Sequence, residues 1–223
     1  MQQSLFGSLV VAEREAAPAK AVEAATPLTE ALFTVIDLET TGLNPRKNAI
    51  TEITAIQFVN GEEAAKFTTL VKPTEEIPDE VQALTGINPA MTLDAPAPVQ
   101  ALSELCRFVG EAPVIVGHNV AFDIGFLREK LDQTGLGAFI SRFEVTRAVC
   151  TKVLAQKAMP GLPSYAGVSV ATQCGVYNPN PHRAEYDVRM SAGILFALMS
   201  QLRERDNLRT VADLLTYQGP IAS

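Results

Sequence analysis

Hydrophobic residues dominate three segments between residues 33 and 72, and each segment has the pattern of a β-strand. Residues 33–36 form a continuous run of aromatic and β-branched side chains, which is typical of a buried strand. Residues 50–60 and 64–72 follow with alternating apolar and polar positions, and the Asn60-Gly61 pair between them is a strong hairpin signal. The pattern therefore predicts an antiparallel meander of three strands.

Helical spacing appears after the third strand. A short helix is predicted to begin within residues 77–81 and to stop at Gly86. A longer amphipathic helix follows Pro98. Its predicted apolar face consists of Val99, Leu102, Leu105, Cys106 and Val109.

The second half of the chain alternates between strand-like and helical patterns. Residues 113–117 predict a buried strand, and residues 121–131 have the spacing of a helix. Residues 136–156 are less regular and indicate one strand and one helix. Further helices are expected over residues 167–175 and from about residue 182 to about residue 203. Alternation of this kind indicates an α/β domain.

Composition divides the chain into three parts. Residues 7–30 are rich in Ala and Glu and contain two prolines, which is typical of a tether or a loosely helical arm. We expect a flexible N-terminal arm over residues 1–30, a folded domain over residues 31–204 and a short tail over residues 205–223. Apolar residues in the tail predict one docked turn or helix.

The overall composition excludes several classes of protein. The chain has 223 residues, of which 47% are hydrophobic, so it can bury a full globular core. A net charge of −7 argues against a large basic surface for duplex DNA, but bound metal ions can reverse the local charge of a small site. Three cysteines without metal-ligand spacing, and no secretory signal or membrane-length apolar run, predict a cytoplasmic protein with no membrane partner.

Two acidic residues follow the first predicted strand directly. Side chains alternate along a strand, so Asp37 and Glu39 should lie on the same face. Two neighbouring carboxylates at the end of a buried strand repel each other unless a cation or a proton lies between them. The pair therefore indicates a divalent-metal site of oxygen ligands. Taken alone, this pair of acids is equally consistent with a solvated strand end that binds no metal.

Two more acids and a histidine occupy special positions. Asp123 falls in the first turn of a helix that follows a buried strand, and Asp187 lies on the core side of the long C-terminal helix. His182 precedes Asp187 in a loop that two prolines force to be extended. Carboxylates converging on one pocket require metal ions, and two Mg²⁺ or Mn²⁺ ions about 3.5–4 Å apart would suit an in-line displacement at phosphorus. A histidine is suited to accept the proton of an attacking water.

Three ordered motifs carry a family resemblance. They are Asp37-x-Glu39-Thr40-Thr41-Gly42, Gly117-His118-Asn119-x-x-Phe122-Asp123 and His182-x-Ala184-x-x-Asp187. Together they resemble the motifs of DEDDh 3′→5′ exonucleases, in the branch with the proofreading (epsilon) subunit of bacterial DNA polymerase III and exonuclease X. The resemblance spans roughly residues 32–200. It implies an RNase H-like fold, a mixed five-stranded sheet with helices on both sides.

The resemblance also implies roles for individual residues. Asp37, Glu39, Asp123 and Asp187 would hold two Mg²⁺ or Mn²⁺ ions, and His182 would be the general base. The 3′-terminal nucleotide would be bound by Thr40, Thr41, Gly42, Leu43 and Phe122, with Leu43 wedged against the base. His118 and Asn119 would serve the strand-to-helix turn.

One position departs from the family pattern. The stretch Leu84-Thr85-Gly86-Ile87 resembles the segment that contacts the terminal nucleotide, where histidine often occupies the place of Thr85. This departure leaves the contact with the terminal nucleotide open.

The N-terminus carries a second resemblance. Gln2-Gln3-Ser4-Leu5-Phe6 resembles the pentapeptide by which bacterial replication and repair proteins bind the sliding clamp. Leu5 and Phe6 would be apolar anchors and Gln2 a polar contact. The alternative is that Leu5 and Phe6 fold back on the domain, or that the match arises by chance.

The preferred function is metal-dependent 3′→5′ exonucleolytic cleavage of DNA ends, mainly single-stranded, which releases nucleoside 5′-monophosphates in proofreading or DNA repair. A DNA polymerase subunit is a further expected partner. The same chemistry on RNA is an alternative, because no sequence feature reads the 2′-hydroxyl. A third hypothesis is a non-catalytic adaptor that binds a polymerase or the clamp. The presence of all four acids and His182 argues against it, because an adaptor has no chemical need for them.

Overall fold

The computed structural model describes residues 11–13 and 23–222. Its strands are β1 (Val11–Glu13), β2 (Leu32–Thr40), β3 (Ile50–Val59), β4 (Glu62–Leu70), β5 (Val114–Gly117) and β6 (Val149–Cys150). Its α-helices are α1 (Asp79–Thr85), α2 (Pro89–Thr92), α3 (Pro98–Val109), α4 (Ala121–Gln133), α5 (Thr151–Ala158), α6 (Gly167–Gln173), α7 (Ala184–Arg205) and α8 (Val211–Gln218). Two 3₁₀ segments, η1 (Gly137–Arg142) and η2 (Val145–Arg147), connect α4 to β6.

The strands form one mixed sheet in the order β1-β4-β3-β2-β5-β6. β2, β3 and β4 make the predicted antiparallel meander. β5 then pairs with β2, and β6 pairs with β5, both in parallel. The five strands from β4 to β6 are the expected mixed five-stranded sheet. β1 adds a sixth strand at the β4 edge, within a segment for which the sequence predicts a tether or a loosely helical arm.

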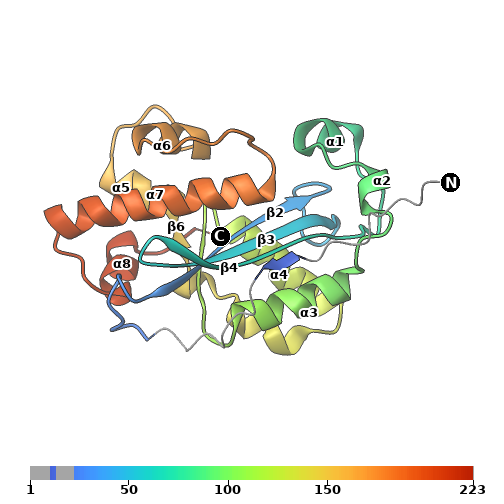
Figure 1. The fold of residues 1–223 in the computed structure, drawn as a ribbon, viewed down its shortest axis with the longest axis horizontal. Helices are drawn as coiled ribbons and strands as arrows, with labels where there is room; N and C mark the ends of the chain where they lie inside the picture. Colours follow the sequence, from blue (N-terminus) through green and yellow to red (C-terminus); the bar gives the residue numbers. More distant parts are fainter. Residues whose placement is uncertain (1–10, 14–22, 223) are drawn as a thin grey trace.

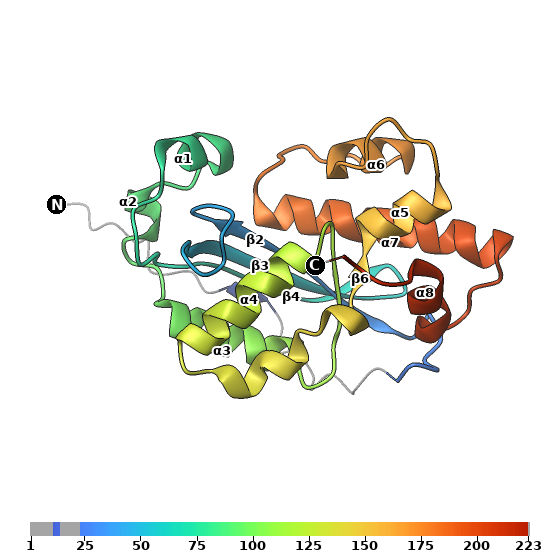
Figure 2. The ribbon, with the colours of Figure 1, turned by 180° about the vertical axis from the view of Figure 1, so that it is seen from behind.

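Helices cover both faces of the sheet. α7 crosses one face together with α5 and α6, whereas α3 and α4 lie on the opposite face (Figure 1, Figure 2). Alternation along β2 separates the two cores: Phe33 and Val35 pack under α7, and Ile36 and Leu38 pack against the α3–α4 side. The face to which each β2 side chain points is therefore set by its position in the strand.

Most predicted elements are present, with local differences at their ends. The hairpin at Asn60 and Gly61 has positive φ angles of 51° and 85°, as a tight two-residue turn requires. The long helix begins at Ala184 rather than at His182, because His182 has a φ of 63° and cannot continue a helix. Val99, predicted on the buried face of α3, is 45% exposed in the first turn of that helix.

The region before β2 and the tail pack together. Leu28 is buried, and Pro27 forms a β-bridge with Thr210 at the start of α8. The side chain of Gln218, at the end of α8, accepts a hydrogen bond from the Cys150 N–H and donates one to the carbonyl of Ala148. The ordered domain therefore extends on both sides of residues 31–204.

The clamp-like pentapeptide at residues 2–6 lies outside the described residues. Among the helices that the structure does describe, none combines the length and the apolar character needed to cross a membrane.

Candidate active site

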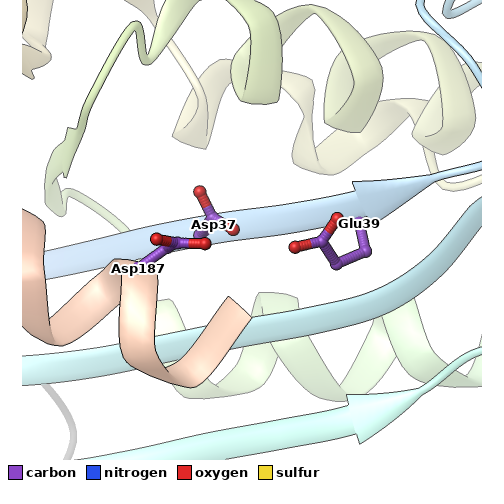
Figure 3. A group of neighbouring side chains, drawn as sticks. All are labelled: Asp37, Glu39 and Asp187. Carbon is purple, nitrogen blue, oxygen red and sulfur yellow. The ribbon is translucent and has the colours of Figure 1, made fainter. Parts of the chain in front are cut away.

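Three carboxylates meet at the end of β2 nearest the start of α7. Asp37 and Glu39 continue the alternation of Phe33 and Val35, so both point to the α7 side of the sheet. Oxygens of Asp37, Glu39 and Asp187 all lie within 4.8 Å of one another. Figure 3 shows the two acids of β2 facing Asp187, which projects from the first turns of α7.

The strand ends immediately after this pair. The register between β2 and β3 shifts between Glu39 and Thr40, so Thr40 pairs with Ile50. A bulge of this kind bends a strand and is frequent beside active sites. It ends the regular pairing where the loop after Thr40 turns away from the sheet.

Two hydrogen bonds orient the carboxylate of Asp187. Its Oδ2 accepts from the backbone N–H of His182 at 2.8 Å, and its Oδ1 accepts from Nδ2 of Asn178 at 2.8 Å. The left-handed backbone of His182 places this N–H towards the helix. The loop before α7 therefore holds the Asp187 carboxylate in place through both of its oxygens.

Asp123 approaches from the other side of the sheet. It lies in the first turn of α4, is buried, and its Oδ1 accepts a hydrogen bond from the Leu38 N–H at 3.2 Å. It is outside the group of three carboxylates whose oxygens share the 4.8 Å limit. Its charge nevertheless acts on the site, because it raises the pKa of Asp37.

The four acids strongly disfavour ionising together. Burial, and then repulsion from Asp123 and Glu39, holds the pKa of Asp37 well above its usual range. Burial and the neighbouring carboxylates, Glu52 first, raise the pKa of Glu39 to about 8. Burial raises the pKa of Asp123 to about 7 and also raises that of Asp187. Bound cations would oppose these shifts, because a nearby positive charge offsets the mutual repulsion and favours the ionised carboxylates.

The donor set fits hard divalent cations. Every ligand atom offered by the three clustered residues is a carboxylate oxygen, which Mg²⁺ and Mn²⁺ prefer over nitrogen or sulfur. The raised pKa values show that the protein alone does not compensate this charge. Asp37, Glu39 and Asp187 are thus suited to hold metal ions.

The imidazole of His182 lies beside this group and is exposed to solvent. Its positive form would lower the pKa of Asp187, so the ring is within electrostatic reach of the cluster. The ring sits on the loop that the sequence predicts to face the site, opposite the strand.

The loop after β2 is held by its own hydrogen bonds. The Thr40 hydroxyl donates to the carbonyl of Gly42 at 2.7 Å, and the Thr41 hydroxyl donates to the carboxylate of Glu75. A Cβ on Gly42 would lie 2.7 Å from the Asn48 side chain, so a larger residue there would require that side chain to move. Leu43 at the loop tip is 84% exposed. Both hydroxyls are engaged within the protein, which leaves the backbone and Leu43 to meet a ligand.

Phe122 and Thr85 differ in how free their side chains are to contact a ligand. Phe122 is half-buried and packs on Phe126, with ring centroids 4.9 Å apart. The hydroxyl of Thr85 donates to the carbonyl of Val81 at 2.9 Å and accepts from the Ile87 N–H at 3.1 Å. This side chain caps the end of α1 instead of pointing free into the site.

His118 and Asn119 are placed as turn residues. His118 Nε2 donates to the carbonyl of Tyr165 at 2.9 Å, and its Nδ1 lies 2.9 Å from the Thr151 hydroxyl. Burial lowers the pKa of His118, which favours the neutral ring. Asn119 has a φ of 70° at the turn into α4. Both arrangements agree with the expected structural role.

Comparison with known proteins gives the family of this fold and site. The profile of the RNase T family, described as "Exonuclease", matches residues 34–195. This chain belongs to that exonuclease family. The matched range begins in β2 and includes all four acids and His182.

Curated relatives of this exonuclease include replication proteins. It is 34% identical over 175 residues to the DNA polymerase III subunit epsilon of Aquifex aeolicus, covering 78% of this chain and 84% of that protein. It is 32% identical to the PolC-type DNA polymerase III of Halalkalibacterium halodurans, covering 83% of this chain but only 13% of that much longer protein.

Solved structures share the fold. Exonuclease X, in complex with 5′ overhanging duplex DNA, matches 84% of this exonuclease and 99% of its own chain, with a TM-score of 0.62 and 24% identity. Escherichia coli exonuclease I, in complex with a dT13 oligonucleotide, matches 80% of this chain and 43% of its own, with a TM-score of 0.69 and 16% identity. These matches establish the RNase H-like fold of the exonuclease.

Several residues that shape the candidate site were not expected from the sequence. Asn178 orients Asp187, and Glu75 receives hydrogen bonds from Thr41, Asn48 and the Ala49 N–H. Glu52 contacts the start of α7. Asn178 stands in a conspicuous Asn-Pro-Asn-Pro loop, but the other two have no local signal, because their partners are distant in sequence.

Proposed function

We propose that this protein is a metal-dependent 3′→5′ exodeoxyribonuclease that removes nucleotides from DNA 3′ ends as nucleoside 5′-monophosphates. The observation that carries the proposal is the group formed by Asp37, Glu39 and Asp187, whose oxygens lie within 4.8 Å of one another in a fold of the exonuclease family. Such a group needs cations, and cations beside a phosphodiester are what its hydrolysis needs.

Asp37, Glu39 and Asp187 would hold two Mg²⁺ or Mn²⁺ ions, and Asp123 would support Asp37 from the α4 side. When bound, the ions would supply Lewis-acid activation of water and charge stabilisation at phosphorus. Asn178 and the His182 backbone keep the Asp187 carboxylate in a fixed orientation. The chain thus contributes a prearranged set of oxygen ligands.

His182 would act as the general base. Its exposed ring can accept a proton from the attacking water and release it to solvent. The water oxygen forms the new bond to phosphorus, and the bond from phosphorus to the 3′ oxygen of the preceding nucleotide breaks. The released 5′-monophosphate leaves a shortened strand with a 3′-hydroxyl.

The loop after β2 would bind the terminal nucleotide. Leu43, 84% exposed at the loop tip, would contact the last base, and the Thr40–Gly42 backbone and Phe122 would line the sugar side. A single-stranded end fits this arrangement, because an unpaired base exposes the flat face that an apolar side chain contacts. Support for DNA as substrate comes from the relatives, which are DNA polymerase III components and DNA-bound exonucleases.

The test is a gel assay with 5′-labelled single-stranded DNA and an RNA of the same sequence, in Mg²⁺, Mn²⁺ or EDTA. The proposal expects a ladder on DNA that requires metal and disappears in Asp37→Asn, with nucleoside 5′-monophosphates as products. A ladder mainly on RNA would reassign the substrate. Cleavage that persists in Asp37→Asn would refute the assigned site, and folded protein with metal but without cleavage would favour the adaptor reading.

A further inference from the structure

A fifth acid lies next to the carboxylate group without belonging to it. Glu52 of β3 is paired directly opposite Glu39 of β2, so the two side chains share the α7 face of the sheet. Glu52 is only 6% exposed. A buried carboxylate is strongly destabilising unless charged or polar partners surround it, so its contacts indicate what it does.

Both oxygens of Glu52 bind the start of α7. Oε2 accepts a hydrogen bond from the Ala184 N–H at 3.2 Å, and Oε1 accepts one from Nη2 of Arg183 at 3.2 Å. The first N–H groups of a helix have no partner inside the helix, and a side chain usually caps them. The N-cap residue of α7, Arg183, makes no such side-chain bond. Glu52 therefore caps this helix from a neighbouring strand.

The capped turn carries the functional residues of the last motif. Ala184 is three residues before Asp187 and two residues after His182. Because β3 is hydrogen-bonded to β2 on both sides of Asp37 and Glu39, a bond from Glu52 to Ala184 fixes the helix relative to those two acids. The distance between Asp187 and its partners on β2 thus depends on this contact.

Other contacts tie α7 to the sheet, but they are more exposed. Glu185 pairs with Lys66 at 3.4 Å, and Arg189 pairs with Glu63 at 2.7 Å. Arg189, Glu63 and Glu185 have side chains that are 34–44% exposed, and exposed ion pairs contribute little because water screens them. Glu52 is the buried member of this set and lies nearest the site.

We propose that Glu52 is a positioning residue of the active site, which caps α7 and thereby holds Asp187 at metal-binding distance from Asp37 and Glu39. This inference rests on the proposed function. It differs from a purely electrostatic role, in which Glu52 would act through its negative charge on the bound cations.

Two substitutions separate these roles. Glu52→Gln removes the charge but keeps a carbonyl oxygen at the same reach, so it can still accept from the Ala184 N–H, while Arg183, which is 36% exposed, can turn to solvent. Glu52→Asp keeps the charge but is one methylene shorter and loses that reach. Glu62, an exposed glutamate of β4, offers the matched controls Glu62→Gln and Glu62→Asp.

Three measurements are made on each variant of the full chain: hydrogen–deuterium exchange of residues 184–187, calorimetric titration with Mn²⁺, and kcat and KM on single-stranded DNA. For Glu52→Asp we expect faster exchange in the first turn of α7. Mn²⁺ affinity or kcat should fall by roughly 10–100-fold, the usual effect of losing a group that orients a metal ligand. KM should stay within about threefold of wild type, because the loop after β2 is unchanged. Glu52→Gln should keep wild-type exchange and KM, and its Mn²⁺ affinity and kcat should change far less than those of Glu52→Asp.

The opposite order, with Glu52→Gln impaired and Glu52→Asp normal, would overturn the proposal in favour of a charge effect. Equal impairment of both variants, or no effect in either, would overturn it as well. Exchange and Mn²⁺ titration do not require turnover. An inactive wild-type protein would therefore refute the proposed function. The exchange and Mn²⁺ measurements would still test whether Glu52 positions α7.

Discussion

Removing metal from this site should make the stability of the protein depend on pH in an unusual direction. The pKa of Glu39 rises from its ordinary value of 4.5 to about 8 in the folded protein. Between these values the folded protein holds a proton that the unfolded chain has released. The free energy of unfolding therefore falls as the pH rises through this window, by about 1.4 kcal/mol per pH unit for one such group.

The variant Glu39→Gln removes the titrating carboxyl, and with it this pH dependence, while keeping the shape of the side chain. Below about pH 4, under the ordinary pKa of 4.5, both folded and unfolded wild-type chains carry the proton, so the two proteins should have nearly equal stability. At pH 8 the variant should be more stable by several kcal/mol. Neighbouring carboxylates share the same repulsion, so the gain is smaller than a single isolated group predicts. For a protein of this size, this corresponds to a melting temperature higher by roughly 5–10 °C.

The assay is thermal unfolding in EDTA at pH 4, 5, 6, 7 and 8, with Glu62→Gln as the control for a solvated strand glutamate. Adding Mn²⁺ at pH 8 should stabilise the wild type more than Glu39→Gln, because the ions replace the missing proton. Equal melting temperatures of wild type and Glu39→Gln at pH 8 would refute the reasoning. So would a variant that gains more stability at pH 5 than at pH 8.

Three further predictions concern activity and partners. His182→Asn, which tolerates the left-handed backbone and keeps the N–H bond to Asp187, should lower kcat by roughly 10²–10⁴-fold, the usual contribution of a positioned base; full activity in a stopped-flow digestion would remove His182 from that role. Leu43→Ala should raise KM for single-stranded ends by roughly 3–30-fold with little change in kcat, since it removes apolar contact with the terminal base; an unchanged KM in steady-state assays would contradict the base contact. The double variant Leu5→Ala/Phe6→Ala should lose retention on immobilised sliding clamp in a pull-down, and equal retention would discard the clamp motif.

Strand alternation explains why part of the candidate site could be predicted from the sequence alone. Asp37 and Glu39 follow Phe33 and Val35 with a period of two, so their shared face follows from local geometry alone. Asp123 and Asp187 stand in the first turns of helices that periodicity reveals. The spacing of these residues along the chain was sufficient to name them.

The ends of several elements depended on contacts that periodicity does not contain. Residues 11–13 form β1 because the edge of β4 offers unpaired backbone groups. Val99 matches the apolar period of α3, yet it lies in the first turn, beyond the reach of the packed core. α7 begins after His182 because the left-handed backbone there is combined with a hydrogen bond to Asp187.

The sequence by itself determined the α/β class and the shared face of Asp37 and Glu39, because these depend on local periodicity. Motif order singled out the four acids and His182 as candidate site residues. Only the tertiary structure decided that three of the acids form one group while Asp123 binds the Leu38 N–H from the other side. It also decided that Glu52 caps a helix more than 130 positions away in the chain. Hydrogen bonds between residues so far apart arise from how the layers pack, and no local pattern encodes them.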